Sequence, residues 1–521
     1  MKGSAIRNTL VVGIMTLISR ILGMIRDMVF ARLGIGAGMD AFFVAFKIPN
    51  FMRRLFAEGA FSQAFVPVLT EYKATRDHAE VHFLVDRVAG TLAGSLGLLT
   101  LAGMLASPLL VVIFAPGFLH DPAKFDLTAF MLRLTFPYLL FMALVAFAAG
   151  ILNSYGRFGM AALAPVWLNI ILIAAALWAT RWLEQPVLAL AAGVLIAGFV
   201  QLLFLLPALR HLRLLPRPRW GWKDPGVRKV LRLMGPGIFG SSVAQVNLLF
   251  DTLIASFLAT GSVSWLYYAD RLVEFPLGIF GVALGTVILP TLATRHAKGE
   301  QEAFSATLDK GLRWVLLIGL PATVGLVVLA RPTVAALFQY GDFKQFDVEM
   351  SGLALVAFGI GLPAFMLVKI LAPAFYARQD SRTPVRVAVV AMLANMAMNL
   401  LFAVPMVLLH VTGAHAGLAL ATSLASYLNA GQLYYRLRRQ AVYRPQPGWR
   451  VFFLRLGVAS VVLAVALLIG APDVSVWIAM SGPARVLTLS AWIIGGVALY
   501  LATLRLTGVK LSVLWAPERA G

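Results

Sequence analysis

Residues Val187 to Leu209 read VLALAAGVLIAGFVQLLFLLPAL, a run of 23 residues without a charged side chain. A helix of about 20 predominantly apolar residues is long enough to cross the hydrocarbon core of a bilayer. Similar runs recur along the whole chain of 521 residues, which is 60% hydrophobic and only 13% charged. Because soluble domains carry about 25% charged residues, we expect an all-α polytopic membrane protein.

The apolar runs predict about fourteen transmembrane helices joined by short connections. We place these spans near residues 8–33, 38–71, 88–114, 127–153, 159–180, 186–209, 230–259, 265–293, 312–330, 350–377, 385–410, 414–436, 451–471 and 485–506. The run that begins at Thr9 has no small-residue cleavage site behind it, so we expect a retained first span and no signal peptide. The chain has no cysteine, which excludes disulfides and thiolate metal sites.

Basic residues between the spans predict the orientation of the chain. With the N-terminus in the cytoplasm, the cytoplasmic side collects 30 of the 44 lysines and arginines, against 7 on the outer side. We therefore expect a multi-pass protein of the bacterial inner membrane with both termini in the cytoplasm. The net charge of +21 does not indicate a nucleic-acid partner, because the basic residues form no continuous domain. We expect the loop charges to contact anionic phospholipid.

Similar segments recur in the two halves of the chain. The end of the second predicted span resembles the end of the eighth, 223 residues later, and Pro137 and Asn169 have counterparts 226 residues on, in Pro363 and Asn395. Such a repeat predicts two six-span lobes of the same topology, with a substrate site between them. The predicted division is an N-lobe over 1–212, a C-lobe over 213–440, and an appendage of two spans and a tail over 441–521.

Ionisable residues lie at membrane depth in the first, second and eighth spans. Each costs at least ~2.5 kcal/mol on insertion scales, and such residues are usually functional. The candidate substrate-binding residues are Arg20, Arg26, Asp40, Lys47, Arg53, Arg54, Glu58, Arg271 and Glu274. Pairs such as Arg54 with Glu58 and Arg271 with Glu274 could account for part of this set. Because guanidinium groups suit phosphate oxygens, the remaining positive charge predicts an anionic, phosphate-bearing substrate.

No pattern in the sequence indicates catalysis. The chain has no phosphate-binding loop for ATP and no His-Glu-x-x-His motif, and its seven histidines show no ligand spacing. We therefore predict no catalytic residues, no enzyme activity and no organic cofactor. Pairs of glycines spaced Gly-x-x-x-Gly are expected to pack helices.

The segment from Ser19 to Pro67, which includes Asp40-Ala-Phe-Phe-Val-Ala-Phe-Lys47, resembles the MurJ (MviN) family, and the segments 264–276, 376–384 and 446–449 extend the resemblance over essentially the whole chain. The resemblance implies a lipid II flippase of the multidrug/oligosaccharidyl-lipid/polysaccharide exporter superfamily. It also implies a cationic cavity between two lobes and a hydrophobic groove beside the last two helices for the undecaprenyl tail. The charges required in the family correspond here to Arg20, Arg26, Asp40, Arg53 and Arg271.

Some members of the family hold a sodium ion between the seventh, eleventh and twelfth spans. The resemblance implies that Asp251, Asn395, Asn399 and Thr422 could supply oxygens to such an ion here. Some relatives carry an aspartate near the second amide, where this chain has the neutral Asn399. The alternative is that the two buried amides form hydrogen bonds between helices.

The implied mechanism is alternating access, in which the arginines take the pyrophosphate-linked head group of lipid II from the cytoplasmic leaflet and release it outside. A membrane potential or a cation gradient resets the carrier. The expected partners are lipid II, membrane phospholipid and other cell-wall synthesis proteins. Two alternatives remain open: a cation-coupled drug or polysaccharide-lipid exporter predicts acids in the cavity, and a non-transporting cell-wall scaffold predicts dispensable arginines.

Overall fold

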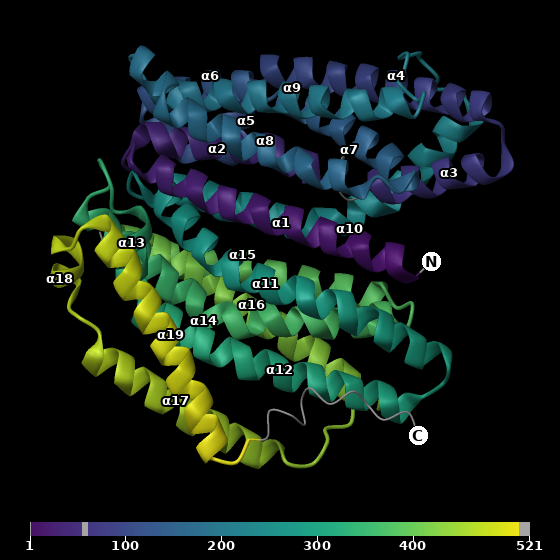
Figure 1. Cartoon of the computed structure of the whole chain (residues 1–521). Helices are drawn as coiled ribbons and strands as arrows, with labels where there is room; N and C mark the ends of the chain where they lie inside the picture. Colours follow the sequence, from purple (N-terminus) through teal and green to yellow (C-terminus); the bar gives the residue numbers. More distant parts are fainter. Residues whose placement is uncertain (1, 55–60, 410, 510–521) are drawn as a thin grey trace. The chain divides into compact units, whose positions relative to one another are not determined.

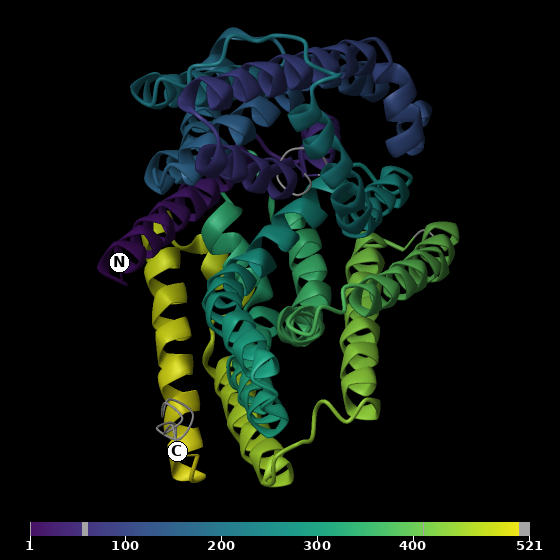
Figure 2. The same ribbon diagram turned by 90° about the vertical axis from the view of Figure 1, so that its right-hand side faces the viewer.

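The computed structural model describes residues 2–54, 61–409 and 411–509, and for residues 2–10, 179–180, 236–244 and 279–287 it describes the backbone alone. All regular structure in this part of the chain is helical, as Figure 1 and Figure 2 show. The chain divides into two compact units, residues 1–264 and 265–521, which are described separately below.

Unit 1 contains the helices of the first half of the chain. They are α1 (Lys2–Ala31), α2 (Ala37–Arg53), α3 (Ser62–Thr75), α4 (His78–Leu105), α5 (Ser107–Phe114), η2 (Pro116–His120), α6 (Pro122–Thr135), α7 (Tyr138–Ser154), α8 (Phe158–Leu177), η3 (Ala179–Trp182), α9 (Val187–His211) and α10 (Pro225–Ser256). The next helix, α11 (Ser262–Ala297), begins in unit 1 and continues into unit 2.

Unit 2 contains the remaining helices. They are α12 (Gln301–Val328), α13 (Ala330–Phe338), α14 (Gln345–Tyr376), α15 (Arg382–Leu408), α16 (His415–Arg439), α17 (Trp449–Gly470), α18 (Val474–Ala479) and α19 (Gly482–Leu506). The predicted three-part division of the chain is not tested by these bounds and stays a prediction.

The prediction of an all-α polytopic membrane protein is confirmed. Nine helical segments of the described residues are long and apolar enough to cross a membrane. The other five predicted spans fall on α1, on α2 with α3, and on α10, α11 and α16, which are less apolar. Most of the candidate site residues lie on these less apolar helices, as expected if polar residues gather where they have a function.

Prolines explain where the predicted spans differ from the helices. The predicted span 88–114 is interrupted at Ala106, because Pro108 lies in the first turn of α5 and cannot donate the hydrogen bond that would continue α4. The span 127–153 is interrupted in the same way before α7, at Pro137. The span 38–71 falls on α2 and α3, with residues 55–60 outside the described residues.

In unit 1, α1 packs along α8, α9 packs against both α7 and α8, and α2 packs against α6 (Figure 1). Aromatic side chains of α2 form part of the core, where Phe42 stacks on Phe46 with ring centroids 5.8 Å apart and meets Phe30 of α1 edge to face. This packing buries the first turn of α2 and fixes the position of its polar residues.

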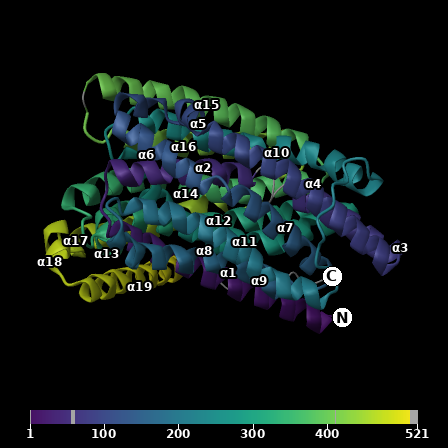
Figure 3. The same cartoon turned by 90° about the horizontal axis from the view of Figure 1, so that it is seen from above.

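In unit 2, α14 lies between α12 and α16, and α15 lies beside α16 (Figure 3). The last long helices, α17 and α19, run side by side and pack against α12 and α13 (Figure 1). Leu463, Leu467 and Tyr500 are buried in the cluster that joins this pair to α12, and the Tyr500 hydroxyl donates to the carbonyl of Leu317 at 2.9 Å.

Arg485 holds one end of the α17–α19 pair. The sequence places this arginine among the outer basic residues, but its side chain is buried. Its guanidinium donates to the carbonyls of Ala335 and Gln339 at 3.3 and 3.0 Å and to that of Ile478 at 2.6 Å. Since the last carbonyls of α13 have no partner within their own helix, the arginine caps α13 and ties α19 to it.

Asp309 of α12 holds the other end of the α17–α19 pair, near the start of α17. Its buried carboxylate accepts hydrogen bonds from the Tyr443 hydroxyl and the Trp449 indole, both at 2.7 Å, and from the amide of Gln446 at 3.1 Å. Burial and the bond to Asp309 both raise the pKa of the Tyr443 hydroxyl, so it stays a donor. The connection between α16 and α17 is therefore fixed on α12.

Candidate functional site

Asp40 lies in the first turn of α2 and is the centre of a buried polar cluster within unit 1. Its carboxylate accepts hydrogen bonds from Lys124 at 2.9 Å, from the amides of Gly261 and Ser264 at 2.7 and 3.0 Å, and from the Ser264 hydroxyl at 2.6 Å. Only 1% of Asp40 is exposed. The two amides belong to the start of α11, where unpaired N–H groups favour an anion. Asp40 therefore caps this turn.

Sequence reasoning missed Lys124 as a member of this cluster. The predicted orientation counts it among the seven basic residues of the outer side. The side chain is buried, with its ammonium 4.1 Å from the centre of the Phe118 ring. Its sequence context, two residues after Pro122, indicates only that it lies in the first turn of α6 and not which way that turn faces. Its charge neutralises Asp40, as a buried carboxylate requires.

Arg26 is buried on α1 and bound on two sides. Its Nε and Nη2 atoms donate to Asp27 at 3.0 and 2.7 Å, and its Nη1 atom donates to the Asn169 side chain of α8 at 3.1 Å. Asn169 in turn donates to the carbonyl of Ser19 at 3.0 Å. Arg26 therefore pairs with the acid next to it in the sequence. This pairing and the bond to Asn169 hold its guanidinium in a fixed orientation.

The other candidate cations of unit 1 also lie on α1 and α2, or directly after α2. Arg20 and Arg54 are exposed, and Lys47 and Arg53 are half-buried. The Arg53 guanidinium donates to the neutral Asn50 side chain at 3.0 Å. Glu58, the predicted partner of Arg54, lies outside the described residues.

In unit 2, Arg271 and Glu274 form the predicted ion pair at i and i+3. The distance from Arg271 Nη1 to Glu274 Oε2 is 2.8 Å, and the guanidinium lies 5.0 Å from the centre of the Tyr267 ring. About a third of the Arg271 side chain is exposed. The Arg271 guanidinium is therefore partly accessible although it is paired.

The residues predicted for a sodium site lie in both units. In unit 1, Asp251 accepts a long hydrogen bond from Asn247 at 3.5 Å. In unit 2, Asn395 and Asn399 of α15 are both buried, and the Thr422 hydroxyl of α16 donates to Leu418 in its own helix at 3.1 Å. The described residues contain no cluster of three acidic or histidine side chains that could hold a metal.

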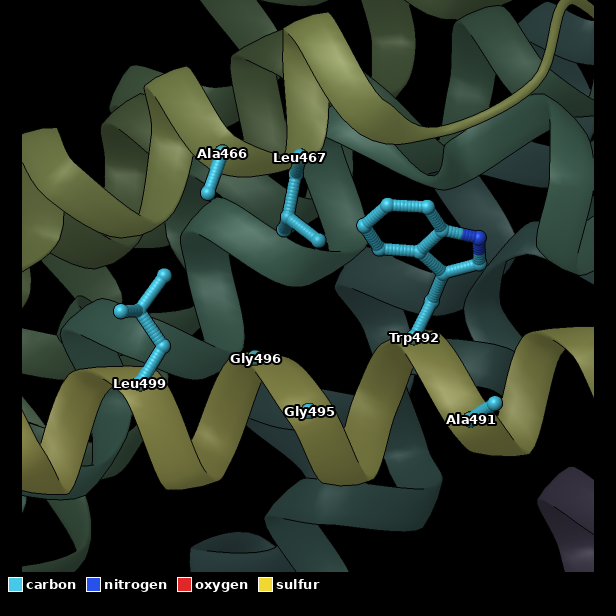
Figure 4. Close-up of a pocket in the computed structure, with 7 residues that line it drawn as sticks. All are labelled: Ala466, Leu467, Ala491, Trp492, Gly495, Gly496 and Leu499. Atoms are coloured by element: carbon cyan, nitrogen blue, oxygen red, sulfur yellow. The ribbon is translucent and has the colours of Figure 1, made fainter.

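An apolar pocket of about 370 Å³ lies between α17 and α19. Figure 4 shows Ala466 and Leu467 of α17 facing the indole of Trp492 across the gap. Gly495 and Gly496 of α19 line its floor, where the missing side chains leave the space open.

Comparison with known proteins gives the family. The profile described as "Lipid II flippase MurJ" matches residues 30–488. The chain belongs to the MurJ lipid II flippase family. It is 47% identical to "Probable lipid II flippase MurJ" of Vibrio cholerae, over 98% of each chain, and 43% identical to "Lipid II flippase MurJ" of Burkholderia cenocepacia, over 88% of each. The resemblance found in the sequence is thereby confirmed.

Solved structures agree with this family. The structure titled "Lipid II flippase MurJ, inward closed conformation" is 25% identical, with a TM-score of 0.78 over 95% of this chain and 98% of that one. An inward-facing multidrug resistance MATE family transporter of the MOP superfamily has a TM-score of 0.66 at 16% identity, over 83% of this chain and 98% of its own. The second likeness shows the shared fold alone.

Proposed function

We propose that this protein flips lipid II from the cytoplasmic to the outer leaflet of the bacterial inner membrane, as a carrier and not as an enzyme. The observation that carries the proposal is the match along 98% of the chain to a curated lipid II flippase at 47% identity. The buried and half-buried arginines on helices of membrane-spanning length support it, because lipid II carries a pyrophosphate.

Arg20, Arg26, Arg53 and Arg271 would bind the pyrophosphate in alternating access. Arg26 is already oriented by Asp27 and Asn169. The half-buried Arg53 donates to the neutral Asn50 side chain, which a phosphate oxygen can replace as the acceptor. Lys47, Arg54 and Glu274 would add polar contacts to the head group. This arginine-rich set favours an anionic substrate over the organic cations of a drug exporter.

The pocket between α17 and α19 would hold part of the undecaprenyl tail. Its lining is carbon apart from the indole N–H of Trp492, and Gly495 and Gly496 leave room for a chain of methyl-branched units. Because the tail stays in an apolar medium, only the head group has to cross the membrane.

Head-group translocation in reconstituted vesicles tests the function. We expect purified protein to move the lipid II head group across the bilayer, faster when a membrane potential is applied, because a charge that crosses gains ~2.3 kcal/mol per 100 mV. Protein-free vesicles are the control. Vesicles that contain folded protein and show no translocation under any potential or cation gradient would favour the cell-wall scaffold.

Cysteine labelling tests the predicted topology, with both termini in the cytoplasm. Native cysteine is absent, so a single introduced thiol is the only one labelled. Lys298→Cys, in the exposed turn before α12, is expected to be protected from an impermeant reagent added to intact cells, and Asp342→Cys, before α14, is expected to react. The reverse pattern would contradict the orientation.

A sodium-coupled carrier would depend on Asp251. We expect Asp251→Ala to reduce the stimulation of lipid II transport by sodium, because a carboxylate is the only charged oxygen ligand in the predicted set. Transport is compared in sodium and potassium buffers, and the melting temperature is measured as a control for folding. Parent protein that flips lipid II equally well in both buffers would remove the sodium site.

A further inference from the structure

The connection between α9 and α10 folds back along α4 in unit 1 and is held there by its backbone. The amides of Arg217 and Arg219 donate to the side chain and the carbonyl of Asp86, at 2.7 and 3.0 Å. One turn further along α4, the amide of Gly221 donates to the Thr91 hydroxyl at 3.1 Å. Three contacts of this kind fix a segment that has no regular structure of its own.

Gly90 and Gly94 make this close approach possible. A methyl group on Gly90 would lie 2.3 Å from the backbone of Arg219, and one on Gly94 would lie 2.6 Å from the indole of Trp220. Glycines four residues apart share one face of a helix. The prediction that Gly-x-x-x-Gly pairs pack helices is therefore wrong for this pair, which accommodates a loop and an aromatic ring.

The segment Arg217–Lys223, called here the tryptophan loop, exposes two indoles in a fixed arrangement. The rings of Trp220 and Trp222 are stacked, with centroids 6.2 Å apart and an interplanar angle of 11°. Their exposed fractions are 63% and 50%, although both are large apolar side chains. One edge of the Trp220 ring rests on Gly94 of α4, whereas at least half of each indole stays exposed.

The same loop is strongly basic. Arg217, Arg219 and Lys223 are exposed, and the acids beside them are used internally. Asp86 accepts from the loop backbone, and Asp224 caps α10 through the amide of Gly226 at 2.8 Å. The tryptophan loop therefore presents stacked indoles and uncompensated positive charge together.

We propose that the tryptophan loop binds anionic phospholipid head groups and anchors this end of α4 at the membrane surface. Arg87 is the last charged residue before the apolar part of α4, and Trp220 covers Gly94 about two turns further along, so the indoles lie near the membrane–water boundary, where tryptophan is enriched. Arginine and lysine at that depth attract anionic lipid. An acidic segment of another protein would match the positive charge of the loop. Such a segment would, however, have to enter the membrane beside the apolar part of α4.

A spin label at residue 218 tests the proposal. Pro218→Cys introduces the only thiol in the chain, at an exposed position whose backbone has no donor to lose. Purified protein is placed in phosphatidylcholine vesicles with increasing phosphatidylglycerol, and the label's accessibility to oxygen and to a water-soluble nickel reagent is measured. We expect phosphatidylglycerol to shift the label from the water-accessible to the lipid-accessible range.

Matched variants separate the loop from general charge effects. Arg217→Gln, Arg219→Gln and Lys223→Gln together should raise the phosphatidylglycerol needed for half the shift by about five-fold for each cation removed, the factor equivalent to ~1 kcal/mol. Arg436→Gln, Arg438→Gln and Arg439→Gln remove the same charge at the end of α16 and should leave the shift unchanged. Trp220→Ala with Trp222→Ala should abolish it, whereas Trp182→Ala, at another exposed indole, should not.

Three results would overturn the proposal. The first is a label that stays equally accessible to water in both lipids while the protein melts normally. The second is an equal loss of the shift in the α16 control, which would assign it to net charge. The third is a shift that appears only after lipid II or a second protein has been added to the vesicles.

Discussion

Arg53→Ala is expected to abolish growth of flippase-depleted cells that carry it as their only copy, with the protein inserted at normal abundance. A guanidinium bound to a phosphate through two charge-assisted hydrogen bonds contributes roughly 3 kcal/mol or more, which is about a hundred-fold in affinity. Folding should survive, because Arg53 is only half-buried and its hydrogen bond to the neutral Asn50 side chain contributes little to stability. Arg53→Lys should restore growth only in part, since an ammonium lacks the planar fork.

Substitutions of two nearby arginines show whether the effect is specific to Arg53. Arg54→Ala removes an exposed charge one residue away and should be milder. Arg26→Ala should lower the melting temperature as well as transport, because it leaves the buried Asp27 without its guanidinium. Abundance, melting temperature and translocation are measured on all three variants, and on Arg20→Ala and Arg271→Ala. A stable, abundant Arg53→Ala protein that still moves lipid II would exclude Arg53 from the substrate site.

Hydrophobic length made the fold predictable, since a bilayer demands runs of about 20 apolar residues and the runs are visible without a structure. Arg26, Asp40 and Arg271 were predictable for the complementary reason, because a charge at membrane depth stands out in such a background. Both signals depend on local sequence alone. They identified the charged residues at membrane depth and the helices that carry them.

The partners of Asp40 were not predictable, because they come from distant parts of the chain. Lys124 is 84 residues from Asp40, and Ser264 is 224 residues away. A lysine after Asp121-Pro122 has the same local sequence signal whether it faces water or a buried carboxylate. The folded-back path of the tryptophan loop escaped prediction for the same reason, since Gly90 and Gly94 do not specify what packs on them.

The pairing of Asp40 with Lys124 gives the second large expected effect. The sequence assigned Asp40 to substrate binding, but in this structure its carboxylate is buried and accepts four hydrogen bonds from Lys124, Gly261 and Ser264. Asp40→Asn should lower stability by roughly 3–5 kcal/mol, because it strands the Lys124 ammonium in the interior. Lys124→Met should cost a similar amount by stranding Asp40.

Combining the two substitutions distinguishes a structural carboxylate from a substrate ligand. Asp40→Asn with Lys124→Met removes both charges, so the double variant should melt above either single variant, which requires an interaction free energy larger than the cost of one substitution, roughly 3–5 kcal/mol. Thermal melting of the three purified proteins, with lipid II translocation measured in parallel, gives both readouts. If Asp40→Asn melts like the parent and loses only translocation, Asp40 contacts lipid II in another conformation. If both single variants melt low and the double variant regains both stability and transport, the carboxylate acts by capping the start of α11 and neutralising Lys124.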